Sequence, residues 1–169
     1  MPPRSFLYHL EPIGIATDYT ESFTSYIYRI AEAHSVRPGK LLASLIIPNI
    51  DKEYMLSRSS PYSGTSFNNS LRSSVRKLNR INGLSNLAIK LVDAMKALVM
   101  RDDLELLTML TWSNVITSRN LLRDLAAWCP FCFQEWKSKG QTIYSPLIWN
   151  LNIVKICKYH NTYCNYSAL

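Results

Sequence analysis

The chain has 169 residues, of which 47% are hydrophobic and only five are glycine. This hydrophobic content is enough for a packed core and argues against wholesale disorder, and the few glycines exclude collagen-like repeats. The length suits one ordinary domain, or a helical domain joined to a small metal-stabilised module.

The net charge of +7 is unevenly distributed along the chain. Residues 51–100 contain eight basic and three acidic side chains, whereas residues 1–50 are balanced. A polyanion would therefore be attracted first to the middle third. The alternative is an ordinary solvated surface, because many proteins of this charge bind no nucleic acid.

The N-terminus does not resemble a signal peptide, and the hydropathy along the chain does not indicate a membrane span. The first ten residues lack the apolar core of a signal peptide, and the longest apolar stretch, residues 41–47, is too short to cross a bilayer. We therefore expect a cytoplasmic protein with reduced thiols. In that compartment, spaced cysteines indicate metal binding more than disulfides.

The first predicted elements are two helices joined by a short turn. Apolar residues recur at helical spacing over residues 21–34, with Asp18 and Glu21 as the predicted capping pair. Arg37, Pro38 and Gly39 interrupt the chain, and a second helix over residues 40–47 is predicted to end before Pro48. Helix, turn and helix together match the outline of a helix-turn-helix.

A candidate nucleic-acid-binding stripe follows a predicted loop at residues 57–70. It consists of four basic residues whose spacing can place them on one helical face: Arg72, Arg76, Lys77 and Arg80. Such a stripe can follow a phosphate backbone, although a solvated helix face would have the same pattern.

The next stretch is predicted to be core. Apolar residues from Leu84 to Val99 form a long amphipathic pattern, and Asp102 with Asp103 can cap a further helix to residue 110. Residues 119–127 are predicted to be helical or turn-like and lead into Cys129.

Two pairs of residues are candidate metal ligands. Cys129 and Cys132 are followed, after a 24-residue gap, by Cys157 and His160. Two intervening residues let a turn point both side chains at one ion, and two such turns supply the four ligands of a tetrahedral Zn²⁺ site. Buried free thiols, a disulfide or a surface histidine are the alternatives. Cys164 is a fifth candidate ligand or the start of an incomplete second site.

The segment between the pairs is predicted to help form the site. Residues 144–151 and 153–156 are rich in aromatic and branched side chains and can form a β-hairpin, with Trp136 and Trp149 covering the metal. Four protein ligands leave no open position for catalysis. We find no nucleotide-binding or hydrolase motif, and His9, His34 and the acidic group at residues 102–105 are explained as structural or surface residues.

Two stretches resemble the TniQ family. One runs from Glu21 to Ala31 and is preceded by Pro12; the other runs from Trp128 through Cys132, Tyr144 and Trp149 to His160. The resemblance implies a mainly α fold, with a helix-turn-helix-like domain at residues 1–118 and a zinc-finger module at residues 119–169.

The function that the resemblance implies is a non-catalytic adaptor in prokaryotic DNA transposition. Such an adaptor links a target-recognition complex to the AAA+ ATPase TnsC; in CRISPR-associated transposons, that complex is an effector carrying guide RNA bound to target DNA. A nucleoid-associated protein, with homo-oligomers as an option, is expected. The alternative is an autonomous sequence-specific DNA-binding regulator, and a metal hydrolase is a distant third.

Overall fold

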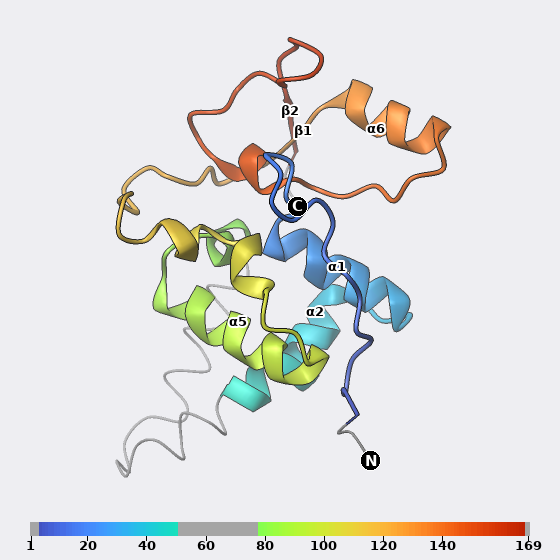
Figure 1. Cartoon of the computed structure of the whole chain (residues 1–169), viewed down its shortest axis with the longest axis vertical. Helices are drawn as coiled ribbons and strands as arrows, with labels where there is room; N and C mark the ends of the chain where they lie inside the picture. Colours follow the sequence, from blue (N-terminus) through green and yellow to red (C-terminus); the bar gives the residue numbers. More distant parts are fainter. Residues whose placement is uncertain (1–3, 51–77, 168–169) are drawn as a thin grey trace.

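The structure is a computed structural model that describes residues 4–50 and 78–167 (Figure 1). It is mainly helical, with a two-stranded antiparallel sheet, as predicted. The α-helices are α1 (Phe23–Ala33), α2 (Pro38–Leu41), α5 (Asn86–Val99) and α6 (Pro130–Ser138). A π-helical turn, η1 (Leu42–Ile46), follows α2. The 3-10 turns are η2 (Leu78–Asn82), η3 (Leu104–Leu107), η4 (Met109–Trp112) and η5 (Leu147–Asn150), and the strands are β1 (Ala126–Trp128) and β2 (Asn165–Ser167).

Helix α1 forms where the apolar spacing predicts it. Its cap is Ser22, whose side chain accepts a hydrogen bond from the Ser25 amide. The predicted capping pair is wrong, because the Asp18 carboxylate binds Lys158 of the C-terminal region and Glu21 is buried. The predicted core face is confirmed: Phe23, Tyr26, Ile27, Ile30 and Ala31 are all buried.

The second helix continues past Pro48, contrary to the predicted end. Residues 47–50 are helical, and the preceding η1 turn is π-helical, with the Ile47 amide donating to the Leu42 carbonyl. A π turn is wider than an α turn. It therefore makes room for the proline ring, which would otherwise clash with the preceding turn.

Helix α5 supplies much of the helical core. Ser85 caps it, and it ends at Met100, which has a left-handed backbone (φ 58°) and donates its amide to Lys96. The helix predicted after Asp102 and Asp103 is instead two 3-10 turns, η3 and η4. Asp103 makes no side-chain cap, because its carboxylate binds Arg101 at 2.6 Å.

The antiparallel strands differ from those predicted. β1 pairs with β2, with Ala127 opposite Tyr166. The predicted strands at residues 144–151 and 153–156 are wrong, since residues 147–150 form the η5 turn. Pro146 precedes η5 with φ −59° and has no amide hydrogen to donate to a neighbouring strand. A 3-10 turn therefore forms here, and it buries Trp149. Of the residues 119–127 predicted to be helical or turn-like, 119–125 form turns and extended chain, and 126–127 belong to β1.

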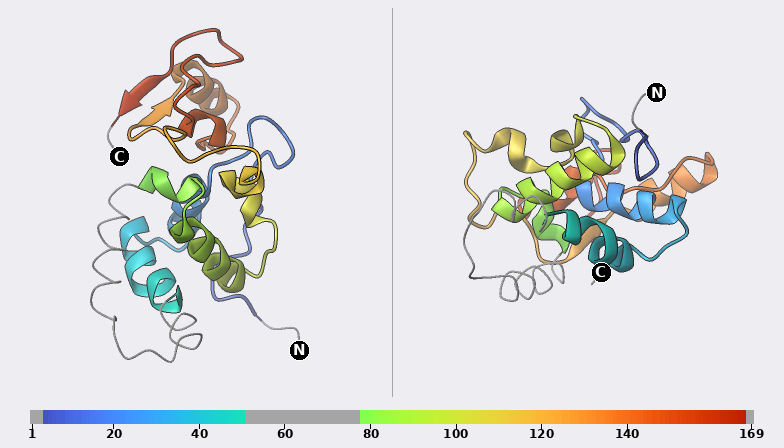
Figure 2. Two further views of the ribbon diagram at one scale, coloured as in Figure 1. Left: turned by 90° about the vertical axis from the view of Figure 1, so that its left-hand side faces the viewer. Right: turned by 90° about the horizontal axis from the view of Figure 1, so that it is seen from below.

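Buried side chains form two hydrophobic clusters. One joins α1, the α2–η1 segment and α5; the other surrounds the cysteines of the C-terminal region and includes Tyr19 from the N-terminal segment. Figure 2 shows the strands and α6 at one end of the molecule and the long helices below them. The boundary between residues 1–118 and 119–169 remains a prediction. No helix within the described ranges is long and apolar enough to cross a membrane.

Candidate metal centre

The first ligand pair lies at the start of α6. Cys129 is the residue that precedes the helix, Pro130 occupies its first position, and Cys132 lies in its first turn. Proline is favoured here because the first helical amides have no partner within the helix. The Phe133 amide donates to the Cys129 carbonyl, which closes the turn between the two cysteines.

The second pair lies on a tight loop between two extended segments. Ile156 and Tyr163 face each other in an antiparallel bridge, and the Cys157 amide donates to the Thr162 carbonyl at 2.8 Å. The chain reverses at Asn161, whose left-handed backbone (φ 48°) suits asparagine, and its amide donates to the Cys157 carbonyl. The turn brings Cys157 and His160 to the same side as the first pair.

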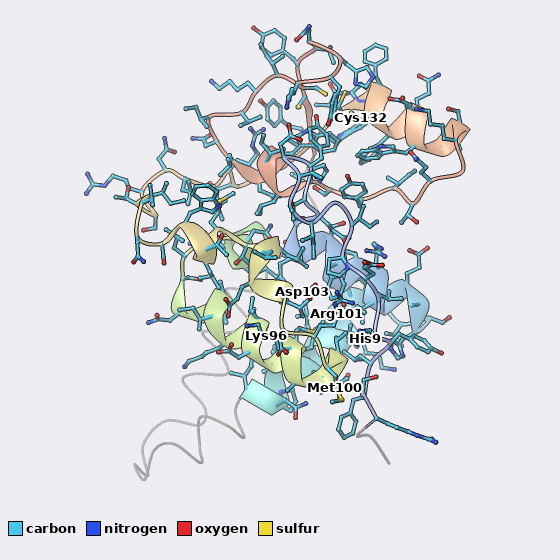
Figure 3. All side chains as sticks on the ribbon, in the orientation of Figure 1. His9, Lys96, Met100, Arg101, Asp103 and Cys132 are labelled. Carbon is cyan, nitrogen blue, oxygen red and sulfur yellow. The ribbon has the colours of Figure 1, made fainter. Side chains whose placement is uncertain are left out.

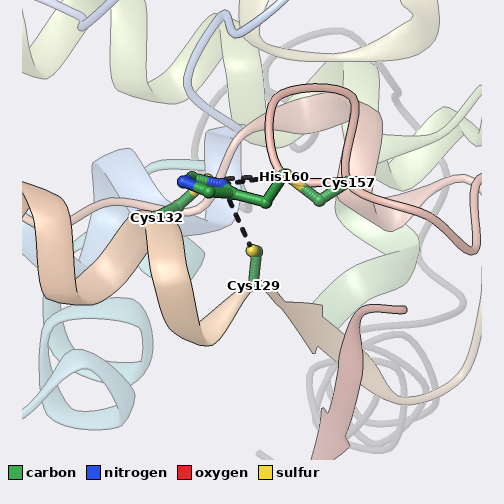
Figure 4. A group of neighbouring side chains, drawn as sticks. All are labelled: Cys129, Cys132, Cys157 and His160. Carbon is green, nitrogen blue, oxygen red and sulfur yellow. Dashed lines mark hydrogen bonds between the residues drawn. The ribbon is translucent and has the colours of Figure 1, made fainter. Parts of the chain in front are cut away.

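The four predicted ligands come together in one cluster (Figure 4). His160 Nδ1 lies 3.7 Å from the Cys129 sulfur, 3.4 Å from Cys132 and 3.6 Å from Cys157. The Cys132 and Cys157 sulfurs are 3.6 Å apart, and all four ligand atoms lie within 4.8 Å of one another. Figure 3 places Cys132 in the region of α6, away from the helical core.

The distances of His160 Nδ1 from the three sulfurs, and of the Cys132 sulfur from that of Cys157, match the edges of a metal-centred tetrahedron. Zinc bonds of about 2.3 Å to sulfur and about 2.0 Å to nitrogen place two sulfurs about 3.8 Å apart, and a sulfur and a nitrogen about 3.5 Å apart. The four ligand atoms therefore surround a space of the right size for one ion. The cluster can hold a metal ion.

The three ligand cysteines and Cys164 are buried and form no disulfide. Burial raises the pKa of Cys132, and so do the neighbouring thiols of Cys157 and Cys129. Burial alone would also raise the pKa of Cys157, but hydrogen bonds from Tyr19 and His160 lower it to about 6. Binding of a metal ion therefore has to displace at least the Cys132 proton.

Two side chains outside the ligand set contact it. The Tyr19 hydroxyl lies 3.3 Å from the Cys157 sulfur and can donate to the thiolate. Glu135 Oε2 lies 3.7 Å from His160 Nε2, the ring nitrogen that faces away from the cluster. A carboxylate there favours a proton on Nε2, which leaves Nδ1 free to bind metal.

Aromatic rings cover the cluster as predicted. Trp149 is buried in the same hydrophobic cluster as the four cysteines, and Trp136 packs against it. The two indole rings lie 5.9 Å apart and are stacked. Cys164 is also buried there, but its sulfur lies outside the four-ligand group, and burial raises its pKa.

The basic stripe is only partly described. Arg72, Arg76 and Lys77 lie outside the described residues, as does the loop predicted at 57–70. Arg80 is exposed in η2 and lies 3.8 Å from Asp124. The structure therefore shows one exposed member of the stripe.

The isolated histidines have structural partners, and Figure 3 labels His9 beside Arg101. His9 Nδ1 lies 2.9 Å from the Val99 carbonyl, and Arg101 approaches its other nitrogen. His34 accepts the Tyr8 amide hydrogen bond and stacks on the Tyr8 ring. Both therefore help to hold the N-terminal segment against the helices.

The structure also reveals why the first family-like stretch contains polar residues. The buried Glu21 carboxylate accepts hydrogen bonds from Arg29 at 2.6 Å, Ser25 at 3.0 Å and the Ile13 amide at 3.2 Å. The Ser25 hydroxyl in turn accepts the amide of Ser145. The start of α1 is thereby tied to the segment that precedes η5.

Sequence reasoning missed the roles of Tyr19, Glu135 and Ser25. Each acts through a partner distant in the chain, at separations of 138, 25 and 120 residues respectively. The one local signal was the four-residue spacing of Glu21, Ser25 and Arg29, which places them on one face of the helix predicted over residues 21–34.

Fold and site together define a mainly helical protein with a small C-terminal module whose Cys₃His cluster can hold a metal ion. The TniQ family model matches residues 12–163, and the chain belongs to the TniQ family. A comparison with curated proteins gave no match. Membership of this family indicates an adaptor role associated with transposition.

Proposed function

We propose that this protein is a non-catalytic adaptor that links a target-recognition complex to the AAA+ regulator TnsC. The family match over residues 12–163 carries the proposal, because it spans both the α1 region and the metal centre. We take the target-recognition complex to be an RNA-guided CRISPR effector bound to its DNA.

We further propose that Cys129, Cys132, Cys157 and His160 hold one structural Zn²⁺. The Cys₃His donor set and its separations suit zinc, which accepts sulfur and imidazole ligands in a tetrahedron. Zinc bound by four side chains has no position left for water. This favours a scaffold over a metal hydrolase, and a bound water at the ion would contradict it.

Reconstituted transposition tests the adaptor role. Omitting the protein from a mixture of effector complex, TnsC, transposase and donor DNA should abolish guided insertion, and adding it back should restore insertion. The protein should also co-purify with TnsC on DNA. Normal guided insertion without the protein would refute the proposal.

The second candidate is an autonomous DNA-binding regulator. It rests on the two helical segments joined by the turn at residues 34–37 and on the basic stripe that ends at Arg80. It requires tight, sequence-selective binding by the isolated protein that weakens steeply with salt. Weak binding that is indifferent to sequence would favour the adaptor.

A further inference from the structure

A cavity lies beside the metal centre. Its volume is about 370 Å³, and Cys132 forms part of its wall. Four aromatic side chains from well-separated parts of the chain line it: Tyr19, Trp136, Tyr144 and Tyr159. Of these four side chains, only the Tyr19 hydroxyl contacts the Cys157 sulfur, which also receives a backbone hydrogen bond from Tyr159.

The four rings are arranged as two contacting pairs. The Trp136 and Tyr144 rings stack with centroids 4.7 Å apart, and the Tyr19 and Tyr159 rings lie 4.5 Å apart. The Tyr144 hydroxyl donates to the Tyr19 carbonyl at 3.0 Å, which joins the two pairs. Tyr159 is 60% exposed, so the cavity has an aromatic wall that solvent and ligands can reach.

Charged groups at the rim show which ligands suit this wall. Glu135 lines the cavity and binds the ammonium group of Lys139, which also lines it. The ammonium of Lys158 lies 6.0 Å from the centre of the Tyr159 ring, within the range of a cation–π contact. Glu135 therefore already binds a cation of the chain at the cavity, whereas Lys158 lies outside the lining and is held by Asp18.

A bound metal ion would strengthen this preference. Three thiolates around a divalent ion would leave one net negative charge, and one of those cysteines, Cys132, forms part of the cavity wall. Aromatic faces and a carboxylate together form the type of cage that binds ammonium and guanidinium groups. An anion would face Glu135 and the metal centre with no unpaired cation among the lining residues.

We propose that this cavity is a receptor for a cationic side chain, arginine or lysine, presented by a protein partner. The incoming group contacts the Tyr159 and Trp136 rings and replaces the Lys139 ammonium at Glu135. Only the assignment of the cation to a partner protein rests on the proposed adaptor role. Binding by the cavity itself is testable on the isolated chain.

The test uses the full-length, metal-loaded protein labelled with ¹⁵N. Three capped pentapeptides serve as probes, each with a central residue between glycines: arginine, lysine, or citrulline, which is the neutral isostere of arginine. The arginine and lysine peptides should shift the Trp136 indole and Gln141 amide signals saturably at millimolar concentrations, and the citrulline peptide should not.

Variants separate the cage from general stability. Tyr159→Ala should weaken binding about threefold, Tyr159→Phe should retain it, and Lys139→Met should tighten it about threefold because a competing cation is removed. Tyr163→Ala is the matched control, since Tyr163 is 71% exposed on the same loop and lies outside the cavity. Metal content is measured for every variant.

Two results would overturn the proposal. One is an equal response to arginine and citrulline, or no saturable response, in protein with a full equivalent of metal. The other is saturable binding of uridine 5′-monophosphate with no response to arginine, which would assign the cavity to a nucleobase. Normal guided insertion without the protein, together with saturable arginine binding by the isolated chain, would refute the adaptor role and leave the cage standing.

Discussion

Neighbouring side chains give the cysteines of one cluster opposite acid–base properties. Burial raises the pKa of both Cys132 and Cys157, but only Cys157 receives the Tyr19 hydroxyl, which with His160 lowers its pKa to about 6. In the metal-free cluster at neutral pH, Cys157 is therefore mainly a thiolate, whereas Cys132 keeps its proton. Metal affinity should rise with pH, because binding displaces at least the Cys132 proton.

The first prediction compares two buried cysteines. Cys132→Ser removes a ligand and should reduce bound zinc from about one equivalent to a small fraction, with loss of order in residues 129–160, because the metal supplies folding energy to so small a module. Metal analysis and hydrogen exchange measure the two effects.

Cys164→Ala is the control for this prediction. Cys164 is equally buried but lies outside the four-ligand group, so this variant should keep a full equivalent of zinc. Less than half an equivalent in freshly prepared wild-type protein would count against the whole site.

At the scale of elements, the buried ion pair of α1 connects two parts of the chain. The Glu21 side chain is fully buried, and its partner Arg29 is 17% exposed. Ser25 bonds both to Glu21 and to the Ser145 amide. The pair therefore organises the start of α1 and the approach to η5 together.

The second prediction is that Arg29→Met destabilises the protein by about 3 kcal/mol, because the buried carboxylate loses its counter-charge. Burial raises the pKa of Glu21, and Arg29 opposes that rise. In the variant, folded Glu21 retains a proton that the unfolded chain has released. Stability should therefore fall as pH rises, and the deficit should be larger at pH 8 than at pH 5.

Denaturant unfolding at the two pH values measures this effect. Arg80→Met is the matched control: its pair with Asp124 is exposed on both sides, so its loss should change stability by less than about 1 kcal/mol at either pH. A pH-independent deficit for Arg29→Met would show that lost packing, rather than the buried charge, is responsible.

At the scale of the whole molecule, the two family-like stretches are in contact. Glu21 bridges Pro146, the Leu147 amide donates to the Thr20 carbonyl, and Tyr19 reaches the metal ligand Cys157. The metal module is thereby held against the start of α1. We expect a surface spanning both parts to be the one that an adaptor presents to its partners.

The third prediction concerns the basic middle third. Arg76→Ala combined with Arg80→Ala should weaken association with nucleic acid and reduce the salt-dependence slope by about two, without changing the unfolding temperature. Affinity measured at several salt concentrations provides the check. An unchanged slope would identify the stripe as a solvated surface.

The sequence by itself determined the features that depend on local spacing. The apolar period predicted α1 and α5, and two residue pairs, each with two residues between its members, predicted the cluster that forms. Residues close together in the chain determine the period of a helix and which side chains one turn can bring together. The helices and the two pairs can therefore be predicted from the sequence. The family-like stretches were also local patterns, and the family match confirms them.

Only the tertiary structure decided which distant segments meet. The strand partner of β1 is β2, which follows the second ligand pair. Residues 147–150 form the η5 turn where a strand was predicted, because Pro146 precedes them and Trp149 is buried. Tyr19 beside Cys157 and the aromatic cavity likewise depend on packing of segments more than a hundred residues apart. Such contacts depend on the packing of the whole core, because the residue spacing within a short segment does not identify the distant segment that it contacts.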